Sequence, residues 1–476
     1  MVHFILIYGF DYYMSNLIFQ PKIRGGDGMN IQLSDNFNYS KLIKFTLPTI
    51  FMMIFTSIYG VVDGLFVSNV VGSDAFAAVN LVMPVIMICG TFGFMIGTGG
   101  GALVSKVIGE GNSKKAKETF SMLIYLLIII GLIIAVIGFI FINPISKALG
   151  AEGVILEYCV MYGRILLISL VAFLLQNAFQ SFLVVAEKPT MGLVISIFAG
   201  ITNIVLDFLL IMILDMGVVG AGLATCISQI VGGFVPLIYF MMKNKSPLRL
   251  GKTKLDFNAI GQSCLNGSSE MFTNLSMSIV NMLYNLQLMK YAGAEGVVAY
   301  GVIMYVSFIF NGVYIGYSMG ITPVVGYHYG ADNKDELKSL LKKSFVVILI
   351  ASLALTGLAQ SFSEILAKIF VSYDIDLLNL TINAIRIFSL SYLISGFNVF
   401  ASAFFTGLNN GVVSGFIAFL RTFVFQIIMI FVLPLLFNVN GLWMAVIFAE
   451  VLALCVSFIC FIKNKGLYQI ELINSV

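Results

Sequence analysis

The stretch GEGNSKKAKETF, residues 109–120, recurs 221 residues later as GADNKDELKSLL, residues 330–341. A second pair of stretches, VVGSDAFAAVN (70–80) and YAGAEGVVAYG (291–301), is separated by the same distance. An offset that stays constant between separate stretches indicates an internal duplication. The chain is therefore expected to contain two copies of one structural unit.

The sequence between these repeats is strongly apolar. Hydrophobic residues make up 59% of the 476 residues and charged residues only 10%, whereas a soluble chain has about a quarter charged. Apolar stretches of about 20 residues, each able to cross the hydrocarbon core of a bilayer, recur from end to end, and they lack the alternation of a β-barrel. Such segments cover residues 45–70, 76–104, 119–142, 159–185, 190–214, 219–242, 259–290, 297–323, 344–363, 380–408, 411–437 and 441–462. We predict an all-α polytopic membrane protein with twelve transmembrane helices.

The basic residues of the loops indicate an orientation. Loops that follow odd-numbered helices carry three lysines or arginines, whereas loops that follow even-numbered helices, with the approach to helix 1 and the tail, carry eighteen. Basic loops stay on the cytoplasmic side, so both termini are predicted to be cytoplasmic and the protein to lie in the cell (plasma or inner) membrane. Six helices per copy insert both copies the same way up. Two parallel-repeat six-helix bundles related by an axis along the membrane normal follow.

The repeat boundaries also divide the chain into domains. The pentapeptide RGGDG before Met29 reads as translation of a ribosome-binding site, so we expect Met29 to be the natural start and part of the preceding extension not to be native. The predicted domains are an N-terminal extension (1–40), an N-lobe of helices 1–6 (41–242), a cytoplasmic linker (243–258), a C-lobe of helices 7–12 (259–465) and a cytoplasmic tail (466–476).

Carboxylates occur at membrane depth in the first copy. On helix 5, Asn203 and Asp207 are four residues apart and share one face. Asp63 on helix 1 and Asp207 each lie seven residues from the outer end of their helix, about 10 Å deep at 1.5 Å per residue, and Thr56 and Tyr59 share the face of Asp63. Intramembrane acids are costly and usually functional. If helices 1 and 5 face each other, the pocket would bind a proton or a sodium ion; the alternative is two buried acids satisfied by hydroxyls and water, with no role in transport.

Charged residues of the second copy give a further candidate site. Glu270 and Glu450 are candidates for a second ion or substrate site, with Arg421 as a counter-ion for either, although Glu270 also fits a local polar cap. Arg164 and Arg386 occupy matching positions in both copies. We expect these two arginines to have a structural or snorkelling role.

The acids themselves are not shared between the copies. Asp63 falls on Tyr284 and Asp207 falls on Met429 when the repeats are superimposed. A residue present in only one copy is a better functional candidate than one kept in both. We therefore place the ion-coupling site in the first copy.

These patterns resemble the multidrug and toxic compound extrusion (MATE) family over residues 40–465. The resemblance rests on LPTIFMMIFTSIYGVVDGLFVSNVVGSDAFAAV (47–79), GTGGGALVSKVIGEGNSKKA (97–116), NIVLDFLLI (203–211) and the recurrence of the pattern from Gly267. It implies a V-shaped pair of six-helix lobes, monomeric and without a cofactor. Such a protein exports amphipathic organic cations by alternating access, in exchange for H+ or Na+.

The resemblance also implies site residues. Thr56 stands where some relatives have glutamine, and Glu270 matches a helix 7 acid that some members use. The family's cation site, which would hold any bound sodium, matches Asp63, Asn203 and Asp207, with Tyr59, Asn177 and Thr225 as neighbours.

Two other functions were weighed. A lipid-linked precursor flippase of related architecture is expected to line its cavity with several arginines or lysines, but here three intramembrane arginines stand against four acids. An intramembrane enzyme would need an Asp-rich metal motif, a His-Glu pair or a Ser-Lys dyad, and the sequence contains none of these and only two histidines. We therefore expect no catalytic residues and no nucleic-acid partner. The expected partners are organic cations and the lipid bilayer.

Overall fold

A computed structural model describes residues 31–66, 70–372 and 374–467, without the side chains of residues 61, 63–65 and 73. The chain divides into two compact units, Met1–Gln32 and Leu33–Val476. Met29, nearly all of the first unit and residues 468–476 of the predicted tail lie outside the described residues. The fold and the sites below belong to the second unit.

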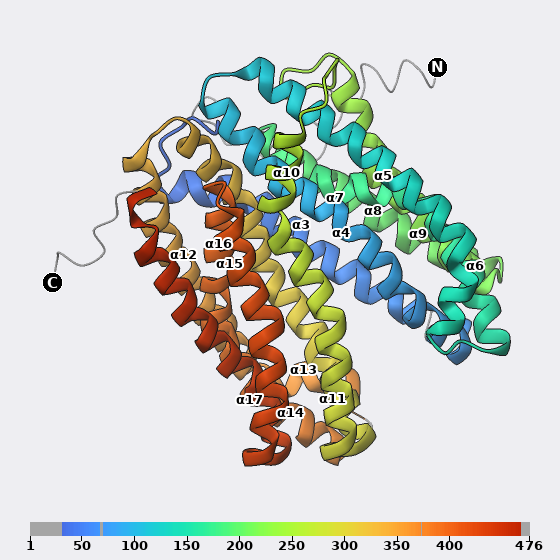
Figure 1. Ribbon diagram of the computed structural model, residues 1–476. Coiled ribbons are helices and arrows are strands. Elements are labelled where there is room, and N and C mark those ends of the chain that lie inside the picture. The colour runs from blue at the N-terminus through green and yellow to red at the C-terminus, as the bar shows by residue number, and fades with distance from the viewer. Residues whose placement is uncertain (1–30, 67–69, 373, 468–476) are drawn as a thin grey trace, which may run out of the picture. The chain divides into compact units, whose positions relative to one another are not determined.

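The second unit is helical almost throughout its described residues, which contain no β-strand (Figure 1). The first half contains α3 (Tyr39–Phe66), α4 (Ser73–Gly109), α5 (Ser113–Ala148), α6 (Gly153–Ile168), α7 (Leu170–Val185), α8 (Pro189–Asp207), the π-helix η3 (Phe208–Ile213) and α9 (Gly217–Met241). The second half contains α10 (Phe257–Asn266), α11 (Ser268–Gly330), α12 (Lys334–Ser361), α13 (Ser363–Val371), α14 (Ile375–Phe388), η4 (Ser389–Ser391), α15 (Tyr392–Gly407), α16 (Gly411–Phe419), the π-helix η5 (Leu420–Val424), α17 (Phe425–Lys463) and η6 (Lys465–Leu467).

The described helices account for twelve spans. Nine helical stretches are long and apolar enough to cross a membrane, and α6 with α7, bent by 56° at their junction, make a tenth. Two of the nine are 63 and 53 residues long, and each is interrupted by one residue with a positive φ, Gly293 (φ 63°) or Asn438 (φ 50°). Glycine and asparagine tolerate this conformation better than other residues do. Each long stretch is therefore a pair of spans, and the predicted all-α, twelve-helix fold is confirmed.

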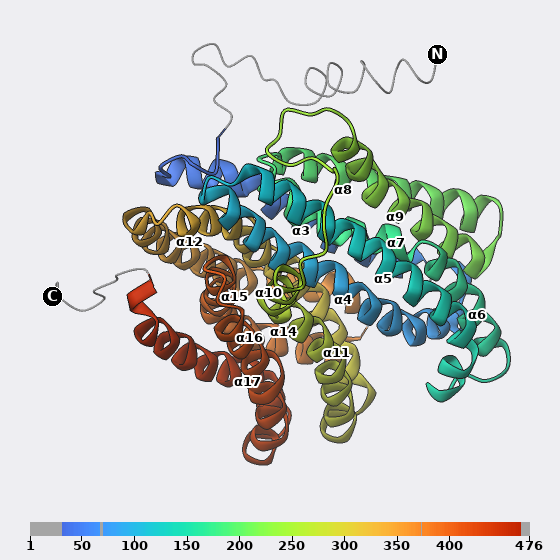
Figure 2. The same ribbon diagram turned by 45° about the horizontal axis from the view of Figure 1, so that its top comes forward.

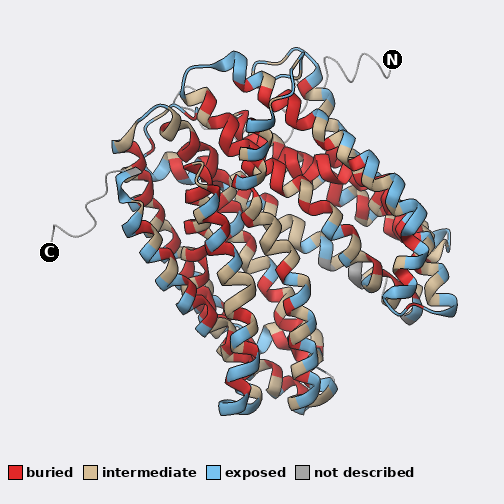
Figure 3. Cartoon of the chain, viewed as in Figure 1, coloured by how far each residue is buried: buried red, intermediate tan, exposed pale blue. Residues whose placement is uncertain are grey.

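Each half of the unit packs its own core. Residues from α4 to α9 form a large cluster that includes the stacked rings of Phe179 and Phe240, 5.5 Å apart. Residues from α11 to α17 form another around the fully buried Trp443 and Tyr284. Figure 3 shows buried residues along the interior of the helices and exposed residues along their outer faces. Large apolar side chains are exposed there, including Ile140 (64%) and Leu435 (74%), as lipid contact requires.

The two bundles touch through helices α4 and α11, which lie side by side in Figures 1 and 2. A Cβ atom added at Gly109 would lie 2.0 Å from the carbonyl oxygen of Tyr327, and one added at Gly330 would lie 2.0 Å from that of Lys106. Both glycines and both carbonyls are related by the 221-residue repeat. The contact is therefore nearly symmetric, and only glycine fits at its two closest points.

Helix ends depart from the predicted boundaries for a physical reason. Helix 3 was expected from residue 119 and helix 9 from residue 344, yet α5 begins at Ser113 and α12 at Lys334. An asparagine caps each of these helices, because the side chains of Asn112 and Asn333 accept the backbone N–H groups of Lys115 and Glu336. Hydropathy marks only the part of a helix that lies in hydrocarbon, whereas the cap marks where the helix begins.

Candidate functional site

Helices α3 and α8 face each other, as the predicted ion pocket requires. A Cβ atom added at Gly200 of α8 would lie 2.5 Å from Cε1 of Phe55 and 3.0 Å from Cδ1 of Tyr59 on α3. Asn203 and Asp207 follow Gly200 by three and seven residues, so they share the helix face that packs on α3. Both helices belong to the first bundle, and the polar residues Asn203 and Asp207 lie on the side of α8 that faces α3.

Asp207 is the most deeply buried acid of the described residues. Its exposed fraction is 0%, and that of Asn203 is 2%. Directly after Asp207 the α-helix gives way to the π-helix η3, in which the N–H of Leu214 donates to the carbonyl of Leu209 at 3.0 Å. Such π segments are rare and often mark functional sites. The backbone is thus irregular on the outer side of the buried carboxylate.

Two predicted neighbours lie on helices α7 and α9. The hydroxyl of Ser228 on α9 donates to the carbonyl of Ala199 on α8 at 2.8 Å. Because α9 runs opposite to α8, three residues back along α9 and four residues on along α8 place Thr225 and Asn203 at about the same level. Asn177 on α7 is 4% exposed. The structure therefore places Thr225 level with Asn203, and buries Asn177 on α7.

Several of these polar atoms have spare hydrogen-bonding capacity. Nδ2 of Asn177, Nδ2 of Asn203 and Oγ1 of Thr225 are buried and have no hydrogen-bond partner among the described residues. Buried polar groups in proteins are nearly always paired with protein, water or an ion. The amide N–H groups can donate to water or to a carboxylate, and the hydroxyl and amide oxygens of the same side chains can accept from water or face a cation.

The predicted residues of helix 1 are less completely described. The backbone of Asp63 belongs to α3, but its side chain lies outside the described residues, so the matched depth of the two acids stays a prediction. The ring of Tyr59 is partly buried against Gly200. The hydroxyl of Thr56 donates to the carbonyl of Met52 at 2.8 Å, which leaves its lone pairs as acceptors.

The sequence analysis missed two glutamines. Gln176 and Gln180, one turn apart on α7, line a cavity of about 10 Å³ with Ser196 of α8 and Gly232 of α9. That volume admits about one water molecule. Oε1 of Gln180 has no hydrogen-bond partner among the described residues. The polar run QNAFQS (176–181) in an apolar helix was a signal that could have found them.

In the second bundle, the predicted counter-ion has one close partner. Nε of Arg421 lies 2.9 Å and 3.1 Å from the two carboxylate oxygens of Glu450. Nδ2 of Asn398 donates to the same carboxylate at 2.7 Å, and its Oδ1 accepts the hydroxyl of Ser457 at 3.0 Å. Glu450 is 3% exposed. The structure thus brings Arg421 and Glu450 together in a network that satisfies both charges.

Glu270 stands apart from that network. It lies in the first turn of α11, directly after the break between α10 and α11 at Gly267, and is partly exposed. The only carboxylate within 4 Å of Arg421 in the described chain is that of Glu450. Arg421 is therefore the direct counter-ion of Glu450 and not of Glu270.

The two repeat-related arginines are both exposed on the outside of their bundles. The guanidinium of Arg164 lies 5.1 Å from the centre of the Phe139 ring, and Nε of Arg386 donates to the hydroxyl of Ser363 at 3.1 Å. Phe139 and Ser363 each belong to the same bundle as the arginine that they contact. Their structural role stays a prediction.

Comparison with known proteins adds the family. The MatE family model matches residues 48–209 and again 270–432. The chain belongs to the MatE family. The two matched ranges begin 222 residues apart, so each covers one copy of the internal repeat.

Relatives and solved structures agree with this membership. Multidrug export protein MepA of Staphylococcus haemolyticus is 26% identical over 430 residues, which cover 90% of this chain and 94% of that protein. MepA of Staphylococcus aureus is 23% identical over 435 residues, covering 90% and 95%. Both of these relatives of the MatE protein are named multidrug export proteins.

The fold is shared with crystal structures of MATE proteins. A MATE in complex with MaL6 superimposes with a TM-score of 0.87 at 22% identity, covering 91% of this chain and 98% of the other. A MOP superfamily transporter from Pyrococcus furiosus, described as having a binding pocket of reverse polarity, gives 0.85 at 22% identity, covering 94% and 100%. These likenesses establish the MATE fold, with its twelve helices in two bundles.

Proposed function

We propose that this MatE protein exports amphipathic, mostly cationic organic compounds by alternating access, driven by entry of H+ or Na+. The observation that carries the proposal is Asp207, an acid with no exposed surface in the core of the first bundle, beside amide and hydroxyl groups with unused hydrogen-bonding capacity. The names of its relatives, which are multidrug export proteins, support the substrate class. The protein would work as a monomer in the cell membrane with both termini in the cytoplasm.

The chemistry of the pocket suits a small cation. An ionised carboxylate in a medium of low dielectric constant is costly unless a proton, a metal ion or a charged partner compensates it. Asp207 and the predicted partner Asp63 supply anionic oxygens, while Asn203, Thr225 and Tyr59 supply neutral ligands. A proton would bind one carboxylate, whereas a sodium ion would take oxygens from several of these groups.

Binding of the ion must favour one conformation over the other. An ion shifts the balance between inward-open and outward-open states only if it binds them with different affinities. Neutralising Asp207 removes its demand for water and allows α8 to repack at the π-helix η3. The resulting change narrows the pocket and releases the cationic substrate to the outside. A membrane potential of 100 mV adds about 2.3 kcal/mol for each charge carried inward.

The positions of the intramembrane arginines favour export of cations over the alternative function, that of a lipid-linked precursor flippase. Arg421 is held by Glu450 at 2.9 Å, and Arg164 and Arg386 lie exposed on the outside of their bundles. A pocket for pyrophosphate would need free cationic groups facing it. The intramembrane arginines of the described chain do not provide them.

Proteoliposomes test the proposal. A pH gradient and a sodium gradient are imposed separately, and we expect one of them to drive efflux of ethidium, a lipophilic cation. We expect Asp207→Asn to abolish this efflux. Asp215→Asn is the matched control, because Asp215 is exposed and has a positive φ of 50° that asparagine also tolerates. Wild-type efflux that ignores both gradients would refute ion coupling.

A further inference from the structure

A pocket of about 670 Å³ lies at the basic end of the first bundle, outside the site around Asp207. The first turns of α5, preceded by Asn112, form one wall, and residues 253–258, which lead into α10, form the other. The hydroxyl of Thr253 donates to the carbonyl of Glu118 at 2.7 Å and fixes this linker against α5. The linker leads into the second bundle. The pocket therefore lies between the start of α5 in the first bundle and the chain segment that enters the second bundle.

Among the charged side chains that line the pocket, lysines outnumber acids by three to two. Lys114, Lys115 and Lys254 line it, and in the described chain neither Lys115 nor Lys254 forms an ion pair. The two acids of the pocket are already engaged. Asp256 accepts the N–H of Ala259 at 3.1 Å as the cap of α10, and Glu118 lies 4.0 Å from Lys114.

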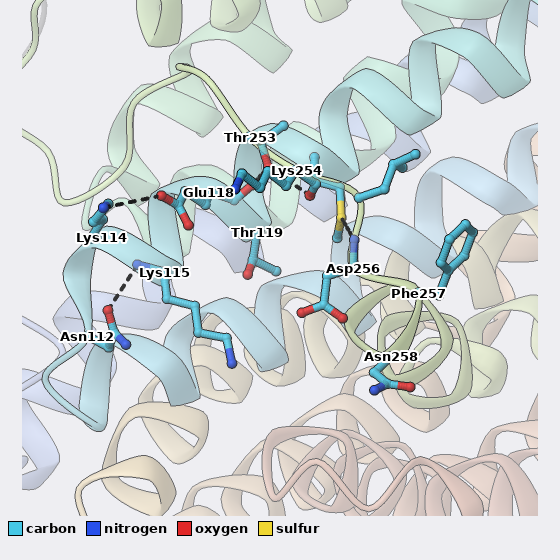
Figure 4. Close-up of a pocket in the computed structure, with 12 residues that line it drawn as sticks. Asn112, Lys114, Lys115, Glu118, Thr119, Thr253, Lys254, Asp256, Phe257 and Asn258 are labelled. Atoms are coloured by element: carbon cyan, nitrogen blue, oxygen red, sulfur yellow. Dashed lines mark hydrogen bonds and ion pairs between the residues drawn. The ribbon is translucent and has the colours of Figure 1, made fainter.

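Large apolar side chains flank the same pocket. Leu255 is 70% exposed and Phe257 is 77% exposed, one on each side of the cap residue Asp256. Figure 4 shows the ring of Phe257 beyond Asp256, turned away from Lys115. Moving the exposed surface of leucine and phenylalanine side chains out of water is favourable. Beside two free lysines at a membrane end, they indicate a partner that is both anionic and apolar.

The corresponding place in the second bundle is closed by the chain itself. There Glu336 occupies the position of Lys115 and accepts the backbone N–H of Phe37 at 2.8 Å, while Lys343 donates to the carbonyl of Phe37. Phe37, which precedes the cap of α3, is 1% exposed. Leu255 precedes the cap of α10 in the same way but stays outside. The repeat thus has one filled copy of this place and one open, positively charged copy.

We propose that the pocket at the start of α5 binds the headgroup of an anionic phospholipid from the adjacent leaflet. The phosphate would lie between Lys115 and Lys254, and the acyl chains would cover Leu255 and Phe257. A free phosphate would satisfy the lysines but leave both apolar side chains in water. A zwitterionic lipid would cover the apolar side chains but would bring no net negative charge to the lysines. Basic groups next to a membrane attract anionic lipids.

The full-length protein in detergent provides the test. Native mass spectrometry would titrate it with phosphatidylglycerol, with phosphatidylcholine and with glycerol 3-phosphate. We expect phosphatidylglycerol to bind at least tenfold more tightly than phosphatidylcholine. The variant Lys115→Gln with Lys254→Gln should lose at least tenfold in that affinity, and Leu255→Ser with Phe257→Ser should lose severalfold.

A matched variant separates the site from general charge effects. Lys338→Gln with Lys342→Gln removes the same charge from α12 of the second bundle and should leave phosphatidylglycerol binding unchanged. An equal loss in both lysine variants, or equal affinity for the two phospholipids, would overturn the proposal. Binding of glycerol 3-phosphate as tight as that of phosphatidylglycerol would show a site for a soluble anion instead. If a double variant is not monodisperse, Lys115→Gln alone and the salt dependence of wild-type binding decide the same question.

Discussion

At the position of Asp207 in the first bundle, the second bundle carries Met429, and at the position of Asn203 it carries Phe425. The first bundle therefore buries a carboxylate next to polar atoms that have no partner among the described residues, while the second carries partly exposed apolar side chains there. The most deeply buried acid described in the second bundle, Glu450, is instead paired with Arg421. After duplication, one copy thus buries an acid beside unpaired amide and hydroxyl groups, and the other buries its acid in an ion pair.

The position of Asp63 extends this comparison. Its counterpart Tyr284 is 1% exposed and stacks on Tyr300 with ring centres 4.8 Å apart. A stacked aromatic pair fills space and fixes the packing of two helices. The second bundle is thus built as a packed scaffold at the level where the first is predicted to bind an ion.

The largest expected effect comes from removing the charge that distinguishes the first bundle. Asp207→Asn should abolish gradient-driven efflux, because an ion that no longer discriminates between two states cannot drive their exchange. Binding of ethidium to the detergent-solubilised protein should also lose its dependence on pH and sodium. Adding Met429→Asp should not restore efflux, since Phe425 replaces the amide of Asn203 there. Restored efflux would show that the two bundles are interchangeable as ion sites.

Breaking the charge pair of the second bundle should affect stability before transport. Arg421→Leu leaves Glu450 buried without its counter-ion, which typically costs about 3–5 kcal/mol. Arg421→Leu with Glu450→Gln should recover most of that loss, because glutamine keeps the bond from Asn398. The emission of Trp443, the only tryptophan and fully buried in the second bundle, reports unfolding there. A single variant as stable as the wild type would contradict a structural role for the pair.

Much of the fold could be read from the sequence because hydrocarbon imposes a length and periodicity on every span. Breaks within the spans were harder to predict. Helix 7 was expected to be continuous over 259–290 but breaks at Gly267, where an added Cβ would lie 1.9 Å from the carbonyl oxygen of Met95. Helix 4 bends at Ser169. Such breaks depend on contacts with helices that are distant in the sequence, and these contacts cannot be predicted from a single sequence.

The site shows the same division. The four-residue spacing of Asn203 and Asp207 fixed their common face, and the glycine contact between α8 and α3 then supplied the facing helix that spacing alone could not. For Arg421 two partners were equally open, because pairing across helices depends on rotation about each axis. The polar pair Gln176 and Gln180 was missed because neutral amides in a helix give a weaker signal than charges.

The symmetric contact between the bundles gives a smaller effect that should be equal for the two copies. Gly109→Ala and Gly330→Ala each place a methyl group against a backbone carbonyl of the other bundle. Overpacking of this kind typically costs about 1–3 kcal/mol. We expect lower thermal unfolding temperatures and slower efflux for both, and Gly357→Ala, at a position with no atom near the added methyl group, should serve as a neutral control. A large effect in one variant alone would show that the contact is not shared equally.

The smallest effect concerns two segments that tie the bundles together. In the N-terminal strap (residues 33–38), the N–H of Leu33 donates to Oε1 of Glu187 in the first bundle at 2.9 Å, and Phe37 is bound by Glu336 of the second. The linker before α10 is held by a neutral bond instead, from Thr253. Only the strap should therefore respond to pH.

The sign of that response follows from Glu187. Burial raises the pKa of its carboxyl above the ordinary 4.5, although the N–H of Leu33 acts to lower it. The folded state thus holds this proton more tightly than the unfolded state, so the contribution of Glu187 to stability is full below its ordinary pKa and is lost as pH rises through the raised value. Glu187→Gln keeps an acceptor for Leu33 without titrating, so the stability of the wild type relative to this variant should fall as pH rises.

Glu187→Ala should cost about 1 kcal/mol by removing the acceptor, and Thr253→Val should cost a similar amount in the linker with no dependence on pH. Thermal unfolding from pH 4 to pH 8 measures all three, and identical pH profiles for the wild type and Glu187→Gln would remove Glu187 as the titrating group of the strap.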